Sequence, residues 1–333
     1  MNVPQVSVVV PTQNRSAMLR RTLGTVLGQK GVALEVIVVD EACEDDTARM
    51  LASLGEPRLS VVHHETAQGL AAARNSGLAE ARAKWVAFCD DDDMWAPDKL
   101  VSQLEALELM PEAEWCASGA VHVDTELHVL FGFEPPEPGD VSHLTLAYNC
   151  IPGGGSGTIA LTQAVRDVGG FDTRLKWGED WDMWCRLSVR SPLAAVPRPL
   201  LAYLVHGENM SRHSPRFNRD VAVIESKYRA ERSDRGVTLD RGMLEFVRAG
   251  IDLDAGRRWS AAWHFLGQAY QDRGFRPVAN AGVALLALRH LARRQAARRR
   301  YVPAGWSAEV EAWLEPLRLE LPLQKYSQRQ GLM

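Results

Sequence analysis

The sequence predicts an α/β fold, in which helices flank a doubly wound sheet, followed by a helical C-terminal region. Three observations support this prediction. Through the first hundred residues, apolar segments of strand length alternate with segments whose apolar residues recur at helical spacing. Acidic side chains directly follow two of the apolar segments. Beyond about Ser214 the pattern is mainly helical.

The first hundred residues predict four strands with helices between them. The strands are expected at residues 6–10, 36–39, 59–62 and 85–89, each a short and largely apolar run. The helices are expected after Ser16, which can cap the first of them, from Asp45–Thr47, over residues 69–83 and from Pro97.

The pattern changes after residue 110. A strand pair is expected at 115–123 and 127–131, a short strand at 158–161, a helix at 181–189 and an extended segment at 194–205. Loops rich in proline or glycine, at 134–139 and 153–157, separate these elements.

The C-terminal region is expected to be a smaller unit. Residues 263–270 fit the W-x-x-L-G-x-x-Y pattern of a tetratricopeptide helix, and one copy predicts a single helical hairpin rather than a repeat array. We therefore divide the chain into a sheet domain, residues 1–213, and a helical region, residues 214–333. At 333 residues the chain is long enough for both.

The composition narrows the function classes. The formal net charge of -4 argues against a general nucleic-acid binder, so we expect no nucleic-acid partner. The five cysteines lack C-x-x-C spacing, which argues against a zinc site or a disulfide framework and favours a reducing cytoplasm. The first apolar segment does not resemble a signal peptide, and no window supplies the ~18–20 apolar residues of a membrane span.

A run of four aspartates is the strongest functional signal. Asp90–Asp93 follow the predicted strand at 85–89, and Asp40 ends the predicted strand at 36–39. Ligands bind at the carboxyl edge of such sheets, so these acids are expected at one edge. Adjacent carboxylates repel one another by roughly 1 kcal/mol per pair even in water. A divalent cation with a phosphate-bearing ligand explains this cost, because hard oxygen ligands suit Mg²⁺ or Mn²⁺.

Six motifs in one order extend this interpretation to a family. They are VVVPTQNR (8–15), VVD (38–40), GLAAARN (69–75), FCDDDDMWAPDKL (88–100), GGFD (169–172) and WGEDWD (177–182). In these motifs the chain resembles family 2 glycosyltransferases over about residues 5–212. The resemblance implies a GT-A fold, a nucleotide-sugar donor, a divalent metal held by a DXD-type motif and inversion at the anomeric carbon.

The resemblance also implies roles for individual residues. The donor-binding set is expected to be Pro11, Thr12, Asn14, Asp40, Glu41, Arg74, Asn75, Asp90 and Asp91. Asp92 is expected to be the principal ligand of Mn²⁺ or Mg²⁺, with His206 beside it. Asp180, in the Glu179–Asp180 motif, is expected to be the general base.

The expected substrates follow from the same resemblance. A UDP-sugar is the expected donor. Because Glu41 replaces an aspartate that touches the base in this family, dTDP- and GDP-sugars remain alternatives. The acceptor is expected to be a glycan, a lipid-linked sugar or a small molecule, in cell-surface polysaccharide or glycoconjugate synthesis.

Several residues have a second interpretation. Asp180 can cap the helix that follows it. Arg74 can pair with nearby acids. Trp177, Trp181 and Trp184 can form a platform for the acceptor, but Trp181 and Trp184 are spaced like core residues. The glycine run at 153–157 lacks the lysine of a P-loop, so it is a weak signal for phosphate binding.

Other functions stay open as well. A non-catalytic sugar-nucleotide-binding or scaffold protein on the same fold is the main alternative to an enzyme. A nucleotidyltransferase needs a glycine-rich basic loop that residues 11–14 do not provide, and a glycosidase leaves the acidic run unexplained. Residues 257–301 hold ten arginines and one acid, so the helix expected at 285–300 can contact the inner face of the membrane or solvate the terminal hairpin.

Overall fold

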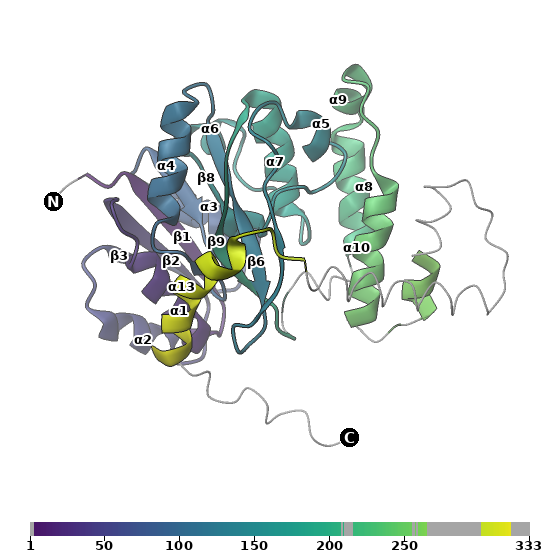
Figure 1. Ribbon diagram of the computed structural model, residues 1–333. Helices are drawn as coiled ribbons and strands as arrows, with labels where there is room; N and C mark the ends of the chain where they lie inside the picture. The colour runs from purple at the N-terminus through teal and green to yellow at the C-terminus, as the bar shows by residue number, and fades with distance from the viewer. Residues whose placement is uncertain are drawn as a thin grey trace.

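The computed structural model describes residues 3–207, 209, 216–254, 257, 259–264 and 301–320. Within that part of the chain, nine strands form one sheet in the order β3-β2-β1-β4-β8-β6-β9-β5, and β7 pairs with the outer side of β6. Helices cover both faces of this sheet (Figure 1). The predicted α/β class is confirmed.

The first half of the sheet is parallel, as the alternating pattern predicts. Its strands are β1 (Val6–Thr12), β2 (Leu34–Glu41), β3 (Leu59–His64) and β4 (Trp85–Phe88). The helices between them are α1 (Ser16–Leu27), α2 (Thr47–Leu54) and α3 (Leu70–Glu80). The central strand β1 pairs Thr12 with Asp40 of β2 and Val9 with Phe88 of β4. The acids that follow β2 and β4 therefore lie at one edge of the sheet, on either side of β1.

The second half of the sheet is mixed. Its elements are β5 (Met94–Trp95), α4 (Lys99–Leu109), β6 (Trp115–Val123), β7 (Val129–Phe133), α5 (Ser142–Thr145), the 3-10 turn η1 (Gly154–Gly157), β8 (Thr158–Leu161), α6 (Thr162–Asp167), α7 (Glu179–Arg190) and β9 (Leu193–Leu204). β8 runs antiparallel to both β4 and β6, whereas β9 is parallel to β6. The long β6 and β9 continue beyond β8 and carry the antiparallel β7.

The predicted elements are present with small shifts at their ends. The helix expected from Pro97 begins at Lys99. The first helix includes Ser16 itself, and its N-cap position is Arg15, so Ser16 is not the cap. Instead, the Ser16 backbone N–H donates to the Asp45 carboxylate at 3.0 Å. This contact joins the end of β1 to the turn after β2.

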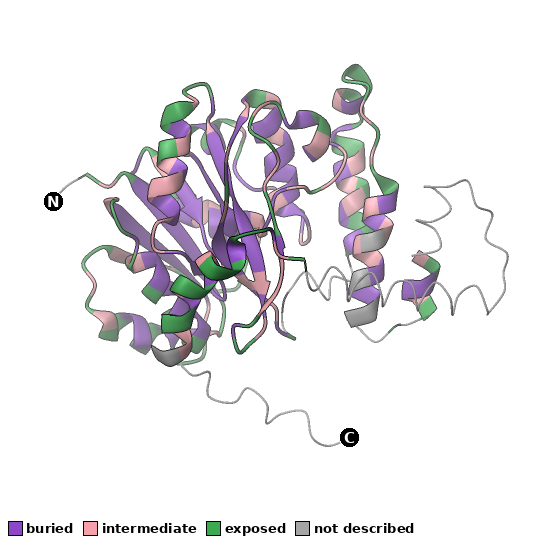
Figure 2. Cartoon of the chain, in the orientation of Figure 1, coloured by how far each residue is buried: buried purple, intermediate pink, exposed green. Residues whose placement is uncertain are grey.

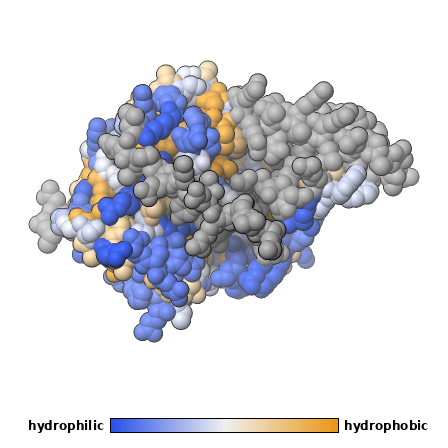
Figure 3. Space-filling model, turned by 90° about the horizontal axis from the view of Figure 1, so that it is seen from below, coloured by the Kyte–Doolittle hydropathy of each residue, from blue (hydrophilic) through white to orange (hydrophobic). Residues whose placement is uncertain are grey.

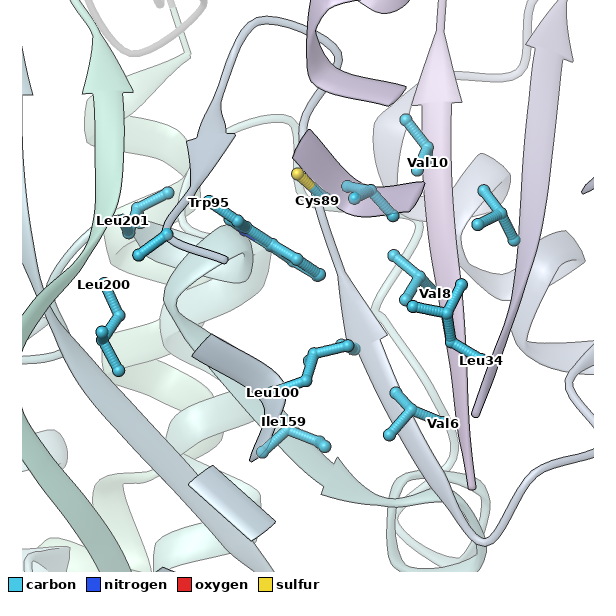
Figure 4. Close-up of a cluster of buried hydrophobic side chains, with 14 of the residues drawn as sticks. Val6, Val8, Val10, Leu34, Cys89, Trp95, Leu100, Ile159, Leu200 and Leu201 are labelled. Atoms are coloured by element: carbon cyan, nitrogen blue, oxygen red, sulfur yellow. The ribbon is translucent and has the colours of Figure 1, made fainter. Parts of the chain in front are cut away.

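The core lies on both faces of the sheet (Figure 2). One cluster includes Val8 and Val10 of β1, Trp95 of β5 and Leu100 of α4 (Figure 4). Trp95 is anchored there because its indole N–H donates to the Ser156 carbonyl at 3.0 Å. The core on this face therefore supports the glycine turn η1.

The C-terminal helices are α8 (Phe217–Lys227), α9 (Arg229–Asp234), α10 (Arg241–Asp254) and α13 (Trp306–Glu320). α8 and α10 pack beside α7, whereas α13 lies across the sheet near β6 and β9 (Figure 1). The proposed boundary at residue 213, the tetratricopeptide-like pattern after residue 264 and the basic helix expected at 285–300 fall outside the described residues. The boundary stays a prediction.

None of the described helices combines the length and apolar character needed to cross a membrane. Viewed from below, the surface is mainly hydrophilic, with smaller apolar areas between the polar residues (Figure 3).

Candidate active site

A cavity of about 750 Å³ opens at the carboxyl edge of the parallel strands. The N-terminus of α7, the turn η1 and the far ends of β6, β7 and β9 complete its walls. Nine residues predicted for the site line it: Pro11, Thr12, Glu41, Arg74, Asp90, Asp91, Asp92, Glu179 and Asp180. The fold thus brings the acidic run and the Glu179–Asp180 motif, about 90 residues apart in sequence, into one space.

The four aspartates of the run have different surroundings. Asp91 accepts from the Thr12 hydroxyl at 2.7 Å and from Arg15 at 3.1 Å. Asp92 accepts from the same Arg15 nitrogen at 3.1 Å. Burial raises the pKa of Asp91 to about 7, and the neighbouring Asp92 adds to this shift, while Arg15 and Thr12 oppose it. The repulsion expected from the sequence is thus relieved in part by Arg15.

Asp93 does not face the cavity. It is fully buried and its Oδ1 accepts from the Leu204 backbone N–H at 3.2 Å. Burial holds its pKa well above the usual range of a carboxyl. Asp93 therefore fixes the end of β9 beneath the site.

Arg74 connects the two acidic motifs. It lies on α3 with only 1% of its surface exposed. Its Nη2 donates to Asp90 at 2.6 Å and its Nη1 to Glu179 at 2.9 Å. Its guanidinium also lies over the Phe171 ring, 5.2 Å from the centroid. The alternative interpretation of Arg74, pairing with nearby acids, is what the structure shows, and the residue also lines the cavity.

Asp180 lies in the first turn of α7 and faces the cavity. The N-cap of that helix is Gly178, in a left-handed conformation with φ 72°, so Asp180 is not the cap. Its Oδ1 accepts from the Trp181 backbone N–H at 2.7 Å, and its Oδ2 is 3.4 Å from the Asn149 amide. A Cβ at Gly154 would approach Oδ2 to 2.9 Å, so glycine leaves the space in front of this carboxylate open.

Burial also changes the pKa values of the two carboxyl groups in the Glu179–Asp180 motif. It raises the pKa of Glu179 to about 7, with Asp180 adding to the shift and Arg74 opposing it. Burial likewise raises the pKa of Asp180, again opposed by Arg74. Both groups are thus better proton acceptors than an ordinary surface carboxylate.

Four predicted residues are not among those that line the cavity: Asn14, Asp40, Asn75 and His206. The Asp40 carboxylate accepts from the Cys43 backbone N–H at 2.8 Å and pairs with His63 at 3.0 Å, beside a separate hollow between α2 and β3. The Asn75 amide bonds to both the N–H and the carbonyl of Phe171, at 2.7 and 2.8 Å.

The side chains of Asn14 and Glu41 also accept hydrogen bonds from backbone N–H groups. Asn14 has φ 54° and accepts from the Glu44 N–H at 2.7 Å. Glu41 does line the cavity, but its carboxylate accepts from the backbone N–H groups of Gln68 and Gly69, at 2.8 and 2.6 Å, and pairs with His64. Its charge is thus used to fix the turn before α3.

Asp92 and His206, the residues predicted to hold a divalent cation, lie beside each other. His206 Nε2 is 2.8 Å from Asp92 Oδ2, and of the two only Asp92 lines the cavity. Among the described residues, no group of three or more His, Cys, Asp or Glu side chains is arranged to hold a metal ion. Mg²⁺-type sites commonly use one or two carboxylates, with substrate phosphates and water as the other ligands.

The structure adds residues that sequence reasoning missed. Arg15 and Lys176 both line the cavity, and Lys176 donates to the Gln68 carbonyl at 3.2 Å. A group of aromatic residues on β6, β7 and β9 lines the far end: His122, Phe131, Phe133 and Tyr203. Alternation along β6 and β9 is the signal that could have found them. Trp181 and Trp184 are core residues, as their spacing indicated.

Comparison with known proteins agrees with this geometry. The sequence model described as Glycosyl transferase family 2 matches residues 7–125. An uncharacterized glycosyltransferase of Haemophilus influenzae is 30% identical over 221 residues, covering 65% of this chain and 74% of that protein. The chain belongs to glycosyl transferase family 2. It is therefore a glycosyltransferase.

Another relative aligns over a shorter stretch. The succinoglycan biosynthesis protein ExoO of Rhizobium meliloti is 36% identical over 103 residues, which cover 31% of this chain and 30% of that protein. The present chain thus spans less than a third of the ExoO protein's length.

Solved structures share the fold. S. aureus TarS 1-349 in complex with UDP-GlcNAc superposes with a TM-score of 0.57 at 19% identity, covering 94% of this chain and 85% of that chain. A mannosyltransferase of Pyrobaculum calidifontis in complex with GDP-Man and Mn²⁺ gives a TM-score of 0.54 at 18% identity, covering 97% and 88%. The GT-A architecture expected from the motifs is confirmed.

Proposed function

We propose that this family 2 glycosyltransferase transfers a sugar, with inversion, from a nucleotide-diphosphate donor to an acceptor hydroxyl in cell-surface polysaccharide or glycoconjugate synthesis. The observation that carries the proposal is the shared cavity, in which Asp92 and Asp180 face the same space and Arg74 connects their motifs. The names of relatives that act in succinoglycan and teichuronic acid biosynthesis support the class of product.

The donor binds at the carboxyl edge of β1, β2 and β4. Pro11 and Thr12 border the base, and Asp90 and Asp91 lie near the ribose. A UDP-sugar is the expected donor, and the structures of TarS in complex with UDP-GlcNAc and with UDP support it. Because the Glu41 carboxylate is engaged by backbone N–H groups, the base is read mainly by other groups, and GDP- or dTDP-sugars remain alternatives.

Asp92 and His206 are the residues that would hold Mn²⁺ or Mg²⁺, and the Mn²⁺ named with the Pyrobaculum enzyme supports the use of a divalent ion. A bound divalent cation supplies positive charge to the diphosphate as it departs. Arg15, which pairs with both Asp91 and Asp92, limits their mutual repulsion.

The chemistry is a single displacement. The acceptor oxygen forms a bond to the anomeric carbon as the bond from that carbon to the diphosphate oxygen breaks, and Asp180 takes the proton of the acceptor hydroxyl. A raised pKa suits this role, because a general base works best when its pKa is near the working pH. Glu179 is held by Arg74 and acts beside Asp180 through its charge. The cavity walls limit competing attack by water.

We place the enzyme in the cytoplasm. The described cysteines are all free thiols, which fits a reducing compartment. Contact of the basic segment 285–300 with the inner face of the membrane stays a prediction, since this segment is outside the described residues.

The test is Asp180→Asn, assayed by release of nucleoside diphosphate from a panel of donor sugars with Mn²⁺. Loss of the base should reduce turnover by roughly 10²–10⁴-fold. Nucleotide binding, followed by thermal shift, should stay nearly unchanged. Asp167→Asn, at the half-exposed end of α6, is the matched control and should behave as the wild type. Unchanged turnover in Asp180→Asn rejects the assigned base, and a wild type that binds nucleotide without any turnover favours the scaffold alternative.

A further inference from the structure

The far end of the cavity carries an aromatic shelf, which we define as His122, Phe131, Phe133 and Tyr203. His122 of β6 lies opposite Tyr203 of β9 and Phe131 of β7 in the sheet register. The ring centroids are 4.7 Å apart for His122 and Tyr203 and 4.4 Å apart for His122 and Phe131. Phe133 completes the group at 5.4 Å from His122 and is 41% exposed. Four rings from three strands thus form one contiguous surface.

The shelf occupies the face of these strands that α13 leaves uncovered. Side chains on a strand alternate between the two faces of a sheet. Val121, Val123 and Ala202 are buried with Trp306, Val310 and Leu314 of α13. Their sequence neighbours on the other face, His122 and Tyr203, line the cavity instead. Because α13 covers the opposite face of these strands, the aromatic side chains lie on the face that lines the cavity.

The shelf lies next to the general base. Ala120 and Leu201 precede His122 and Tyr203 by two residues, so they share a face and lie about 7 Å along the strands. A Cβ at Gly153 would collide with Leu201 and come within 3.4 Å of Ala120. The next residue, Gly154, is the one that lies against the Asp180 carboxylate. The aromatic rings are therefore separated from Asp180 by about 7 Å of strand and the short glycine turn.

The chemistry of the shelf differs from that of the donor end. The donor end is dominated by carboxylates, whereas burial lowers the pKa of His122 to about 3, so its ring is uncharged at physiological pH. Aromatic faces provide flat apolar surface, and the Tyr203 hydroxyl and the His122 ring nitrogens add polar atoms to the group. A sugar ring has the matching character, with apolar C–H faces and hydroxyls at its edge.

We infer that the aromatic shelf binds a sugar ring of a carbohydrate acceptor and directs one of its hydroxyls toward Asp180. This inference rests on the proposed function, because it assigns the acceptor to the same cavity. The acceptor class is then a neutral saccharide, free or at the end of a carrier, and the shelf is a determinant of acceptor affinity.

The test uses Phe131→Leu and Tyr203→Leu, singly and together, which keep apolar volume and remove the aromatic faces. Trp259→Leu, an aromatic residue that is 63% exposed and outside the cavity, is the matched control. Release of nucleoside diphosphate is measured with Mn²⁺ and a panel of nucleotide sugars, first without acceptor and then with glucose-, galactose- and N-acetylglucosamine-based di- and tetrasaccharides. The first condition reports hydrolysis of the donor, and the second reports transfer.

We expect at least one saccharide to stimulate release by the wild type. Each single variant should raise the KM for that saccharide roughly three- to tenfold, and the double variant more than tenfold. Donor hydrolysis and the thermal shift with nucleoside diphosphate should stay as in the wild type, which shows that the donor half is folded. Phe131→Trp should retain the wild-type KM.

Two results overturn the inference while leaving the proposed function intact. One is an unchanged acceptor KM in the double variant. The other is a wild type that hydrolyses the donor but responds to none of the saccharides. A wild type that neither binds nor hydrolyses any nucleotide sugar with Mn²⁺ overturns the proposed function, and the role of the shelf with it.

Discussion

Replacing Arg74 by methionine should destabilise the protein, because the carboxylates that pair with Arg74 would then repel one another without a compensating cation. The methionine side chain fills most of the space of the apolar arginine stem but carries no charge. Asp90 and Glu179 therefore lose the guanidinium that lies 2.6 and 2.9 Å from them in the wild type. Removing one partner of a buried ion pair typically costs about 3–5 kcal/mol, because the remaining charge stays buried. For a chain of this size that corresponds to a fall in Tm of roughly 10 °C.

The loss should depend on pH in a defined direction. Burial raises the pKa of Glu179 to about 7 and Arg74 opposes that shift, so the pKa of Glu179 should rise further without the arginine. An acid with a raised pKa binds more protons in the folded state than in the unfolded state, and stability then falls as pH rises. Because the unfolded state is the same in both proteins, the deficit of Arg74→Met should be constant at acidic pH, where Glu179 is protonated in both folded proteins. It should grow above about pH 7, where the wild type releases this proton and the variant retains it.

The assay is urea unfolding of wild type, Arg74→Met, Glu179→Gln and the double variant at several pH values. In the double variant the amide removes one of the stranded charges, so about 1–3 kcal/mol of the loss should be regained at pH 8. A deficit below about 1 kcal/mol, or one that is the same at pH 5 and pH 8, would show that packing rather than charge is what Arg74 contributes. A lack of coupling between the two substitutions would lead to the same conclusion.

Three further predictions concern the site and its support. Substituting His206 by alanine should weaken Mn²⁺-dependent binding of nucleoside diphosphate at least about tenfold, measured by calorimetry, while metal-free binding changes little; equal weakening in EDTA would refute a metal role. Since burial raises the pKa of Asp180, and that of Glu179 to about 7, kcat/KM should fall on the acidic side well above pH 4; a profile that stays flat down to pH 5 contradicts the proposed base. Gly77→Ala should cost about 1–3 kcal/mol in urea unfolding, because the added methyl would collide with Val9 of β1; a loss below 0.5 kcal/mol would show that α3 can shift freely from the sheet.

Much of the donor half of this molecule could be predicted from local pattern. Apolar runs of strand length and apolar residues at helical spacing specify β1 to β4 and the helices between them, because these signals act over a few residues. Parallel pairing then places the carboxyl ends of those strands at one edge of the sheet. The position of Asp90–Asp93 at that edge could therefore be predicted without knowing any long-range contact. The role predicted for Asp180 follows instead from the resemblance of WGEDWD (177–182) to family 2 glycosyltransferases.

The partners of those side chains could not be predicted in this way. Asn75 and Asp40 belong to recognisable motifs, yet one clamps the Phe171 backbone and the other binds the turn after β2 and His63. Which hydrogen bonds a polar side chain makes depends on backbone groups that come from elsewhere in the chain. A motif predicts where such a residue lies more reliably than what it contacts.

The sequence by itself determined the fold class, the acidic edge and the family, because each is encoded in short-range spacing. Only the tertiary structure decided that Arg74 joins the two acidic motifs, that Asp93 faces inward and that His122 and Tyr203 complete the cavity. The physical reason is that the contacts of Arg74 with Glu179, of Asp93 with Leu204 and of His122 with Tyr203 join residues roughly 80 to 110 positions apart. Their geometry is set by how β8, β6 and β9 pair beyond the parallel strands and by which of their faces α13 covers.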